Sequence, residues 1–298
     1  MAIKKAIVTG GAGFIGSHIV EHLLSVGWHV KVIDNESAET HDNFFWNQDA
    51  ENYKEDVCDY KSIRPLFDGV DVVFHLAAES RIQPTLNNPI LAAEVNTVGT
   101  CTVLQCAKEA GVKRVVYSST SASYGLKNKT PNVESMPNDC LNPYSVSKAA
   151  GEELCKMYTN LFGLETVVLR YFNIYGERQP LVGPYAPVIG LFLKQKKEGK
   201  PMTIVGDGLQ RRDFTYVKDV VDANFLAAQS NQASGEVINI GTGVNYSVLG
   251  IAKKIGGDYI FIENRKGEAR ETLADNSKAK KLLLWEPKTK LKKWIKKQ

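Results

Sequence analysis

Tyr144 and Lys148 are the two side chains whose types and spacing most directly suggest proton chemistry. They lie four residues apart in a stretch that opens with Asn142-Pro143 and continues with helical periodicity, so their polar ends share one helical face. A free tyrosine has a pKa near 10, and lowering it to about 7 takes roughly 4 kcal/mol of extra phenolate stabilisation. A nearby ammonium supplies part of that. The pair is suited to removing a proton from a hydroxyl, although the same spacing also occurs on ordinary helices.

A second constellation lies near the start of the chain, where an apolar run over residues 6–8 is followed by Gly10, Gly13 and Gly16. Such glycines let the backbone turn sharply and approach a pyrophosphate, and the helix that follows presents free N–H groups to it. Asp34 ends the next predicted strand, where its carboxylate suits the adenosine ribose hydroxyls and repels a 2′-phosphate. Strand, turn, helix and acid together predict an NAD site, whereas the glycines alone are also consistent with a bare turn.

Alternating strands and helices must position these residues. The sequence predicts an α/β fold, a Rossmann-type doubly wound parallel sheet with a smaller C-terminal α/β substrate lobe. We expect residues 1–169 to form the NAD-binding domain, with the chain returning to it near 213–230, and residues 170–298 to form mainly the substrate lobe. The predicted elements include strands at 30–34, 53–57, 70–78 and 114–119 and a helix at 88–110.

Two polar residues within these elements have alternative roles. Asp56, near the end of the predicted strand 53–57, either accepts a hydrogen bond from an adenine amino group or caps a turn. Asn96 is unfavourable in the middle of a helix unless it bonds a neighbouring backbone carbonyl or holds an active-site loop or a water molecule. The hydroxyls of Ser118, Ser119 and Thr120 lie at the carboxyl end of the predicted strand 114–119, where a parallel sheet binds ligands.

The composition argues against several classes of protein, including those that bind nucleic acids, membranes or metals. The chain has 298 residues and a net charge of only +4, so we expect no nucleic-acid or membrane partner. Its five cysteines lack Cys-x-x-Cys spacing and resemble reduced cytosolic thiols, and we expect no metal site. The first predicted strand leaves no room for a signal peptide, and we expect no apolar run to approach a membrane span. These features predict a cytoplasmic protein.

Motifs spread over nearly the whole chain point to one family: Thr9–Gly16, His75–Ala78, Asn96, Ser118–Gly125, Tyr144 with Lys148, Arg170–Gly176, Gly206–Gly208, Arg212–Val217 and Arg265–Glu268. With them the chain resembles the extended short-chain dehydrogenases/reductases, and it is most similar to the UDP-glucose 4-epimerase group. The resemblance implies an isomerase that keeps NAD tightly bound. Its substrate would be a UDP-hexose, UDP-glucose or UDP-galactose, epimerised at C4 through a transient 4-keto intermediate.

The resemblance also implies roles for individual residues. Tyr144 is the base, Lys148 lowers its pKa and holds the nicotinamide ribose, and Thr120 bonds the sugar O4, with Ser119 as the near alternative. Residues implied to contact NAD are Gly10, Gly13, Phe14, Ile15, Gly16, Asp34, Asn35, Asp56, Val57, Leu76, Ala77, Ala78, Asn96, Ser118, Tyr144, Lys148 and Tyr171. Residues implied to contact the substrate are Ser80, Thr120, Tyr144, Asn173, Arg212, Arg265, Glu268 and Thr272.

Within the substrate set, the resemblance assigns Asn173, Arg212 and Arg265 to the diphosphate, a role that suits guanidinium forks. It assigns Glu268 to the uridine ribose. A gapless count from Arg265 puts Thr272 where some glucose-specific epimerases carry a bulky tyrosine. This small residue predicts that UDP-GlcNAc and UDP-GalNAc are accepted as well.

Sister activities of the family are distinguished by the residues after Thr120. Related dehydratases and decarboxylases carry an acid there for a second proton transfer, whereas this chain has Ser121 and Ala122. The remaining alternatives are a nucleotide-sugar 4-reductase, a uronic-acid epimerase and a non-catalytic NAD sensor or scaffold. The resemblance further implies a homodimer in which the helices at 88–110 and 144–161 pair with their copies.

Overall fold

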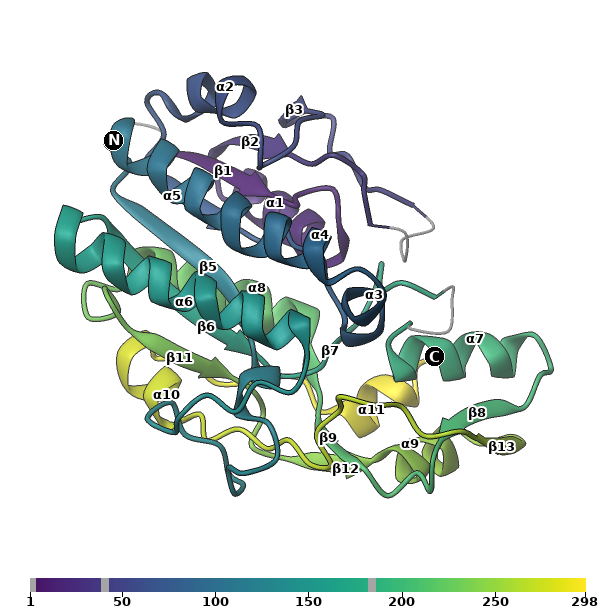
Figure 1. Ribbon diagram of the computed structural model, residues 1–298. Helices are drawn as coiled ribbons and strands as arrows, with labels where there is room; N and C mark the ends of the chain where they lie inside the picture. The colour runs from purple at the N-terminus through teal and green to yellow at the C-terminus, as the bar shows by residue number, and fades with distance from the viewer. Residues whose placement is uncertain (1–3, 39–42, 182–185) are drawn as a thin grey trace.

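A parallel sheet organises the computed structural model, which describes residues 4–38, 43–181 and 186–298. Within these residues seven parallel strands follow the order β11-β6-β5-β4-β1-β2-β3 (Figure 1). Their bounds are β1 Lys5–Thr9, β2 His29–Ile33, β3 Glu51–Tyr53, β4 Val72–His75, β5 Arg114–Thr120, β6 Glu165–Tyr171 and β11 Val237–Ile240. The order reverses direction at β1, so the predicted doubly wound Rossmann-type fold is confirmed.

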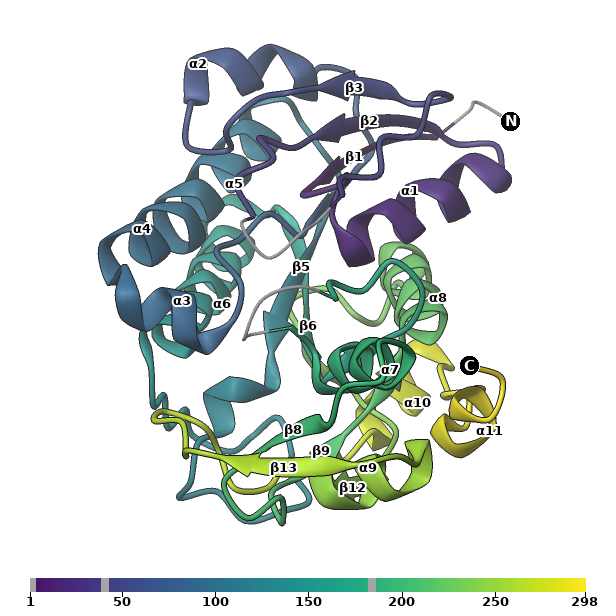
Figure 2. The ribbon, with the colours of Figure 1, turned by 90° about the vertical axis from the view of Figure 1, so that its right-hand side faces the viewer.

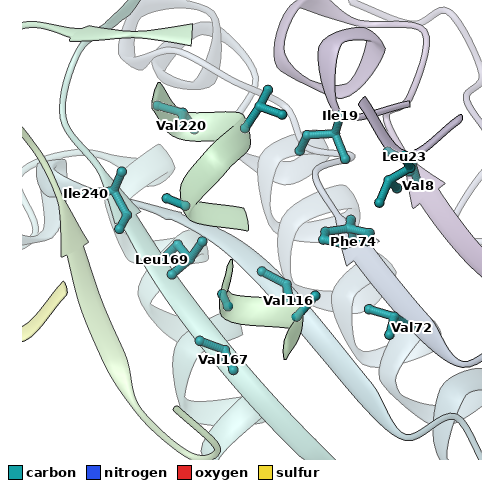
Figure 3. Close-up of a cluster of buried hydrophobic side chains, with 14 of the residues drawn as sticks. Val8, Ile19, Leu23, Val72, Phe74, Val116, Val167, Leu169, Val220 and Ile240 are labelled. Atoms are coloured by element: carbon teal, nitrogen blue, oxygen red, sulfur yellow. The ribbon is translucent and has the colours of Figure 1, made fainter. Parts of the chain in front are cut away.

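Helices cover both faces of this sheet, as Figure 2 shows with the sheet between them. One face carries α1 (Phe14–Ser25), α8 (Val217–Gln229) and α10 (Ser277–Leu283); the other carries α2 (Tyr60–Ile63), the 3-10 turn η1 (Arg64–Phe67), α5 (Thr100–Glu109) and α6 (Pro143–Phe162). Side chains alternate along each strand, so Val8 joins the first core and Ile7 the second. Figure 3 shows the first core, where Ile19 and Leu23 of α1 and Val220 of α8 pack over the strands.

Local sequence explains where α6 begins and ends. The Asn142 side chain accepts a hydrogen bond from the Ser145 backbone N–H at 2.8 Å, and the Ser145 hydroxyl accepts one from the Asn142 N–H at 3.3 Å. Pro143 occupies the first helical position, where its missing N–H costs nothing. Gly163 ends the helix with a φ of 70°. The capping hydrogen bonds at its start and Gly163 at its end therefore set the bounds of the helix that carries Tyr144 and Lys148.

The predicted helix at 88–110 is continuous but not uniform. It comprises α4 (Pro89–Ala93), the π-helical turn η2 (Glu94–Gly99) and α5. Contrary to the sequence expectation, residues 89–109 are long and apolar enough to cross a membrane by length and composition. Half of that stretch is buried, and α5 and η2 pack against α6, as a core helix of a soluble protein also would. The length is therefore only weak evidence for a membrane span.

The predicted strand at 53–57 is wrong in position, because β3 ends at Tyr53. Only residues 51–53 pair with β2. Beyond them the Asp56 carboxylate accepts hydrogen bonds from the Cys58 backbone N–H at 2.8 Å and from the Asn35 side chain at 3.0 Å. The structure thus shows Asp56 as a turn cap, and its hydrogen bond to an adenine amino group stays a prediction.

The C-terminal half builds a second, smaller core below the sheet (Figure 2). Its elements are β7 (Ile174–Tyr175), α7 (Val188–Lys197), β8 (Met202–Val205), β9 (Arg211–Asp213), β10 (Thr215–Tyr216), β12 (Asn245–Ser247), α9 (Val248–Ile255), β13 (Tyr259–Ile262) and α11 (Leu291–Ile295). The short helix α3 (Ile82–Asn87) and the 3-10 turn η3 (Ser121–Tyr124) follow β4 and β5. The chain returns to the main sheet not only through α8 but also through β11 and α10. The domain boundary at residues 169 and 170 stays a prediction.

Candidate active site

A cavity of about 430 Å³ lies at the carboxyl ends of β1, β4, β5 and β6. It brings together most of the residues that the sequence singles out. Those that line it are Gly10, Gly13, Phe14, Ile15, Gly16, Asp34, Asn35, Val57, Leu76, Ala77, Ala78, Ser80, Ser118, Ser119, Thr120, Tyr144, Lys148, Tyr171, Asn173, Arg212 and Thr272. Both ends of the predicted site, the glycine turn and Thr272, therefore share one cavity.

The glycine turn is as tight as a pyrophosphate cradle requires. Gly10 has a φ of 67°, and a Cβ on it would lie 2.7 Å from the Ala77 backbone nitrogen. A Cβ on Gly16 would lie 2.1 Å from the Gly10 carbonyl oxygen, so the helix can start this close to β1 only with glycine there. Gly13 caps α1 without a side-chain hydrogen bond to the first N–H groups. The helix N-terminus thus remains available to an anion.

Asp34 stands at the far edge of this turn. One carboxylate oxygen accepts the Ala12 N–H at 3.0 Å and the other the Glu36 N–H at 2.9 Å. Burial raises the pKa of this carboxyl, and the backbone hydrogen bonds act in the opposite direction. The carboxylate is fixed beside the turn, where ribose hydroxyls of a dinucleotide fit and a further phosphate would be repelled. The residues present therefore fit NAD.

Asn96 lies behind the cavity, in the π-helical turn η2. Its side-chain amide donates hydrogen bonds of 3.0 Å to the Glu79 carbonyl and to the Ser147 hydroxyl. Glu79 belongs to the segment after β4 that lines the cavity, and Ser147 lies on α6 next to Lys148. Of the roles open for this buried amide, the structure shows it holding a loop of the site, and the π-turn presents it there.

Tyr144 and Lys148 both face the cavity but have different neighbours. Burial raises the pKa of the Tyr144 phenol, while the Thr120 hydroxyl and the charge of Arg81 act in the opposite direction. The Lys148 ammonium lies 4.2 Å from the centre of the Tyr117 ring. Burial lowers the pKa of Lys148 to about 7. The positive charge of Arg81, a residue that the sequence reasoning missed, thus favours the phenolate form of Tyr144.

The three hydroxyls at the end of β5 separate into distinct environments. Ser118 shares a 2.9 Å hydrogen bond with the Tyr171 hydroxyl. The Ser119 hydroxyl donates to the Glu152 carboxylate. The Thr120 hydroxyl accepts a hydrogen bond from the Ala122 N–H at 3.1 Å. Its hydrogen bond with the Tyr144 phenol acts to lower the pKa of Tyr144. Of the two candidates for the sugar O4, Thr120 has the freer proton, because the proton of Ser119 is committed to Glu152.

The substrate end of the cavity is formed by the second lobe. The Asn173 amide donates to the Thr272 hydroxyl at 3.4 Å. The Arg212 guanidinium donates to the Arg211 carbonyl at 3.0 Å and pairs with Glu268 at 3.4 Å. Glu268 therefore contacts Arg212 here, and the uridine ribose role that the resemblance implies for Glu268 stays a prediction. Burial lowers the pKa of Arg212.

Four predicted residues, Asp56, Asn96, Arg265 and Glu268, do not line the cavity. Lining residues that the sequence reasoning missed include Phe44, Arg81, Asn142, Tyr175 and Phe214. Arg81 has a φ of 79°, unusual for a residue with a side chain, and a non-glycine residue in a sparsely populated conformation gives no sequence signal. Among the described residues, no cluster of three His, Cys, Asp or Glu side chains could hold a metal ion.

Comparison with known proteins yields consistent matches. Residues 6–241 match the model of the NAD dependent epimerase/dehydratase family. A putative UDP-glucose 4-epimerase of Methanocaldococcus jannaschii is 38% identical, over 97% of this chain and 95% of its own. The crystal structure of a Thermotoga maritima UDP-glucose 4-epimerase with UDP-glucose matches with a TM-score of 0.93 and 35% identity, over 98% of this chain and 96% of that one.

A third match concerns a different sugar. The crystal structure of a Bacillus cereus UDP-glucuronic acid 4-epimerase, in complex with UDP-glucuronic acid and NAD, has a TM-score of 0.87 and 32% identity. The match covers 98% of this chain and 96% of that one. Proteins with this architecture thus act on hexoses that differ at C6.

Proposed function

Because the chain belongs to the NAD dependent epimerase/dehydratase family and uses NAD, we propose that it interconverts the C4 epimers of a UDP-hexose, with UDP-glucose and UDP-galactose as first candidates. The observation that carries this proposal is the shared cavity of Thr120, Tyr144 and the glycine turn. The absence of an acid at Ser121 and Ala122 favours epimerisation over the dehydratase and decarboxylase chemistries.

Each residue has a defined part in the proposed reaction. Tyr144 removes the proton from the sugar 4-hydroxyl and later returns it, and Thr120 hydrogen-bonds the same oxygen. When bound, oxidised NAD supplies the hydride acceptor and a positive charge beside the phenol. Arg81 and, in its protonated form, Lys148 on the Tyr117 ring add further positive charge in the cavity. Asn173 and Arg212 hold the diphosphate, and Arg265 remains a candidate for the same role.

A hexose with an acidic substituent is the second candidate substrate. Arg81 lines the cavity near Tyr144 and brings a positive charge to the end where the sugar must react. The Bacillus cereus protein acts on such a sugar within the same fold. UDP-glucuronic acid is therefore the substrate to compare directly with UDP-glucose.

The proposed assembly is a homodimer. Exposed apolar side chains on α4, η2 and α6 include Ile90, Val98, Val146 and Leu161. These helices lie side by side on one surface of the molecule (Figure 1). A second copy placed against this surface would cover these side chains. The proposed location is the cytoplasm, in keeping with five cysteines that are all free.

Incubating the purified protein with separate UDP-sugars, without added NAD, and resolving the products by chromatography tests the function. We expect UDP-galactose from UDP-glucose. Retention of NAD through gel filtration distinguishes an epimerase from a reductase, which exchanges its cofactor at every turnover. A protein that binds NAD and converts no UDP-sugar would instead be a sensor or scaffold.

A further inference from the structure

A buried ion pair lies behind the hydroxyls at the end of β5. The Glu152 carboxylate of α6 receives hydrogen bonds from the Arg170 guanidinium of β6, at 2.9 Å from Nε and 2.6 Å from Nη2. The two side chains are only 4% and 5% exposed. A buried ion pair adds little net stability, because desolvation offsets most of the attraction. The pair is therefore a candidate for a role other than stability.

Ser119 links this ion pair to the site. Its hydroxyl donates to Glu152 Oε1, the same oxygen that receives Arg170 Nε. Ser119 and Arg170 face each other in the parallel pairing of β5 with β6. One carboxylate therefore joins α6 to directly opposed residues of two neighbouring strands. The residue that follows Ser119 is Thr120.

Glu152 and the proposed base, Tyr144, lie on the same helix, α6. Tyr144, Lys148 and Glu152 occur at intervals of four residues on α6, so they occupy one side of the helix in successive turns. Fixing Glu152 against β5 and β6 fixes the rotation of α6 about its axis. That rotation determines where the Tyr144 phenol lies relative to the Thr120 hydroxyl.

Arg170 is itself held from further sides. Its Nη2 donates to the Asn138 side chain at 3.0 Å, and its guanidinium lies 4.8 Å from the centre of the Tyr124 ring. Tyr124 belongs to η3, the turn that follows Thr120 directly. The ion pair thus also contacts η3, the turn after the strand end that carries Ser119 and Thr120.

We propose that Glu152 is a positioning residue for the reaction: held by Arg170, it acts through Ser119 to align Thr120 on β5 with Tyr144 on α6. The proposal rests on the proposed epimerase function. Glu152 takes no part in proton or hydride transfer. Its effect is confined to the geometry between the hydroxyl and the phenol.

Three variants test this: Glu152→Gln, Ser119→Ala and the double variant. An amide keeps one acceptor oxygen and replaces the other by an NH2 donor, so Glu152→Gln places a donor either against Arg170 Nη2 or, with the amide turned over, against Ser119 and Arg170 Nε. We expect kcat to fall about tenfold in each single variant, because small misplacements of reacting groups are costly. KM for the UDP-sugar should stay within about threefold, since the diphosphate contacts lie elsewhere.

The double variant gives the decisive comparison. If Glu152 acts through Ser119, the losses do not multiply, and kcat of the double variant stays about tenfold below that of the native protein. Glu153→Gln, at the exposed neighbouring position, is the matched control and should keep the native kcat. Melting temperatures measured in parallel separate a loss of folded protein from a loss of alignment.

A kcat within twofold of the native value in either single variant overturns the proposal, as does a double variant whose losses multiply to about a hundredfold. Ser119→Ala leaves the ion pair intact, so it remains informative even if Glu152→Gln does not fold. A native protein that epimerises no UDP-sugar refutes the proposed function instead. Active native protein with unaffected variants refutes only the role of Glu152.

Discussion

The ammonium of Lys148 lies 4.2 Å from the centre of the Tyr117 ring, one turn along α6 from Tyr144. The ring comes from the middle of β5, is fully buried, and offers the cation a face in place of water. Burial lowers the pKa of Lys148 to about 7, whereas the charge of Glu152 acts in the opposite direction. The Tyr117 ring thus takes the place of water around the protonated Lys148, one helical turn from Tyr144, the proposed base.

Replacing Tyr144 with Phe removes the group proposed to take the proton and leaves the ring in place. We expect turnover to fall by at least about 100-fold, the lower range for loss of a general base, while NAD stays bound. Product chromatography and the NAD content of the purified variant measure the two effects. A variant that retains more than a tenth of the native kcat would show that another group is the base.

The charge of Arg81 acts to lower the pKa of Tyr144, so Arg81→Met should alter the pH dependence of kcat. Loss of a positive charge destabilises the phenolate and raises the pKa of Tyr144 further. The reaction needs the phenolate, so the rising limb of the profile should move to higher pH. Arg81→Lys keeps a positive charge and serves as the control. An unshifted limb in Arg81→Met would rule out this electrostatic role.

Thr272 is buried at the substrate end of the cavity and accepts the Asn173 amide at 3.4 Å. Its small size predicts activity on UDP-GlcNAc as well as UDP-glucose. Thr272→Tyr should lower kcat/KM for UDP-GlcNAc by about tenfold or more through steric exclusion, with a smaller effect on UDP-glucose. Thr272→Ser, of similar size, is the control. If the native protein does not convert UDP-GlcNAc while UDP-glucose reacts, the prediction fails.

His75 should make the protein sensitive to acid. The imidazole is buried between the Thr9 hydroxyl at 2.7 Å and the Thr100 hydroxyl at 3.0 Å, and burial lowers its pKa to about 3. The unfolded chain binds this proton below about pH 6.5, whereas the folded protein does not, so stability falls as the pH drops from about 6.5 towards 3.

Urea unfolding at pH 7 and pH 5.5 measures the effect. We expect His75 to account for a loss of about 1 kcal/mol between these two values. His75→Gln retains a hydrogen-bonding side chain without the titration, so its free energy of unfolding should change by that much less over the same interval. Equal losses in the two proteins would contradict the assignment.

Much of the site could be predicted because local sequence determines it. The glycine turn requires residues without a Cβ at Gly10 and Gly16, and the capping pair Asn142 and Ser145 marks the start of α6. The residues that were misplaced depend on tertiary context. β3 ends early because only three residues pair with β2, and Arg81 enters the cavity through an unusual backbone conformation.

The separate environments of Ser119 and Thr120 could not be predicted from the sequence either. Both are hydroxyl residues at the end of one strand, and sequence reasoning left them as alternatives. Glu152 and Arg170 distinguish them, because the carboxylate takes the Ser119 proton. That partner lies 33 residues further along the chain, on a different element.

The central claim is that the hydrogen at C4 leaves the sugar and returns to it within one active site that retains its NAD. UDP-glucose carrying deuterium at C4, incubated with the purified protein and no added cofactor, tests this most directly. The account predicts UDP-galactose that keeps deuterium at C4, as read by NMR. UDP-galactose with hydrogen from water at C4, or no UDP-galactose until NAD is added, would contradict it.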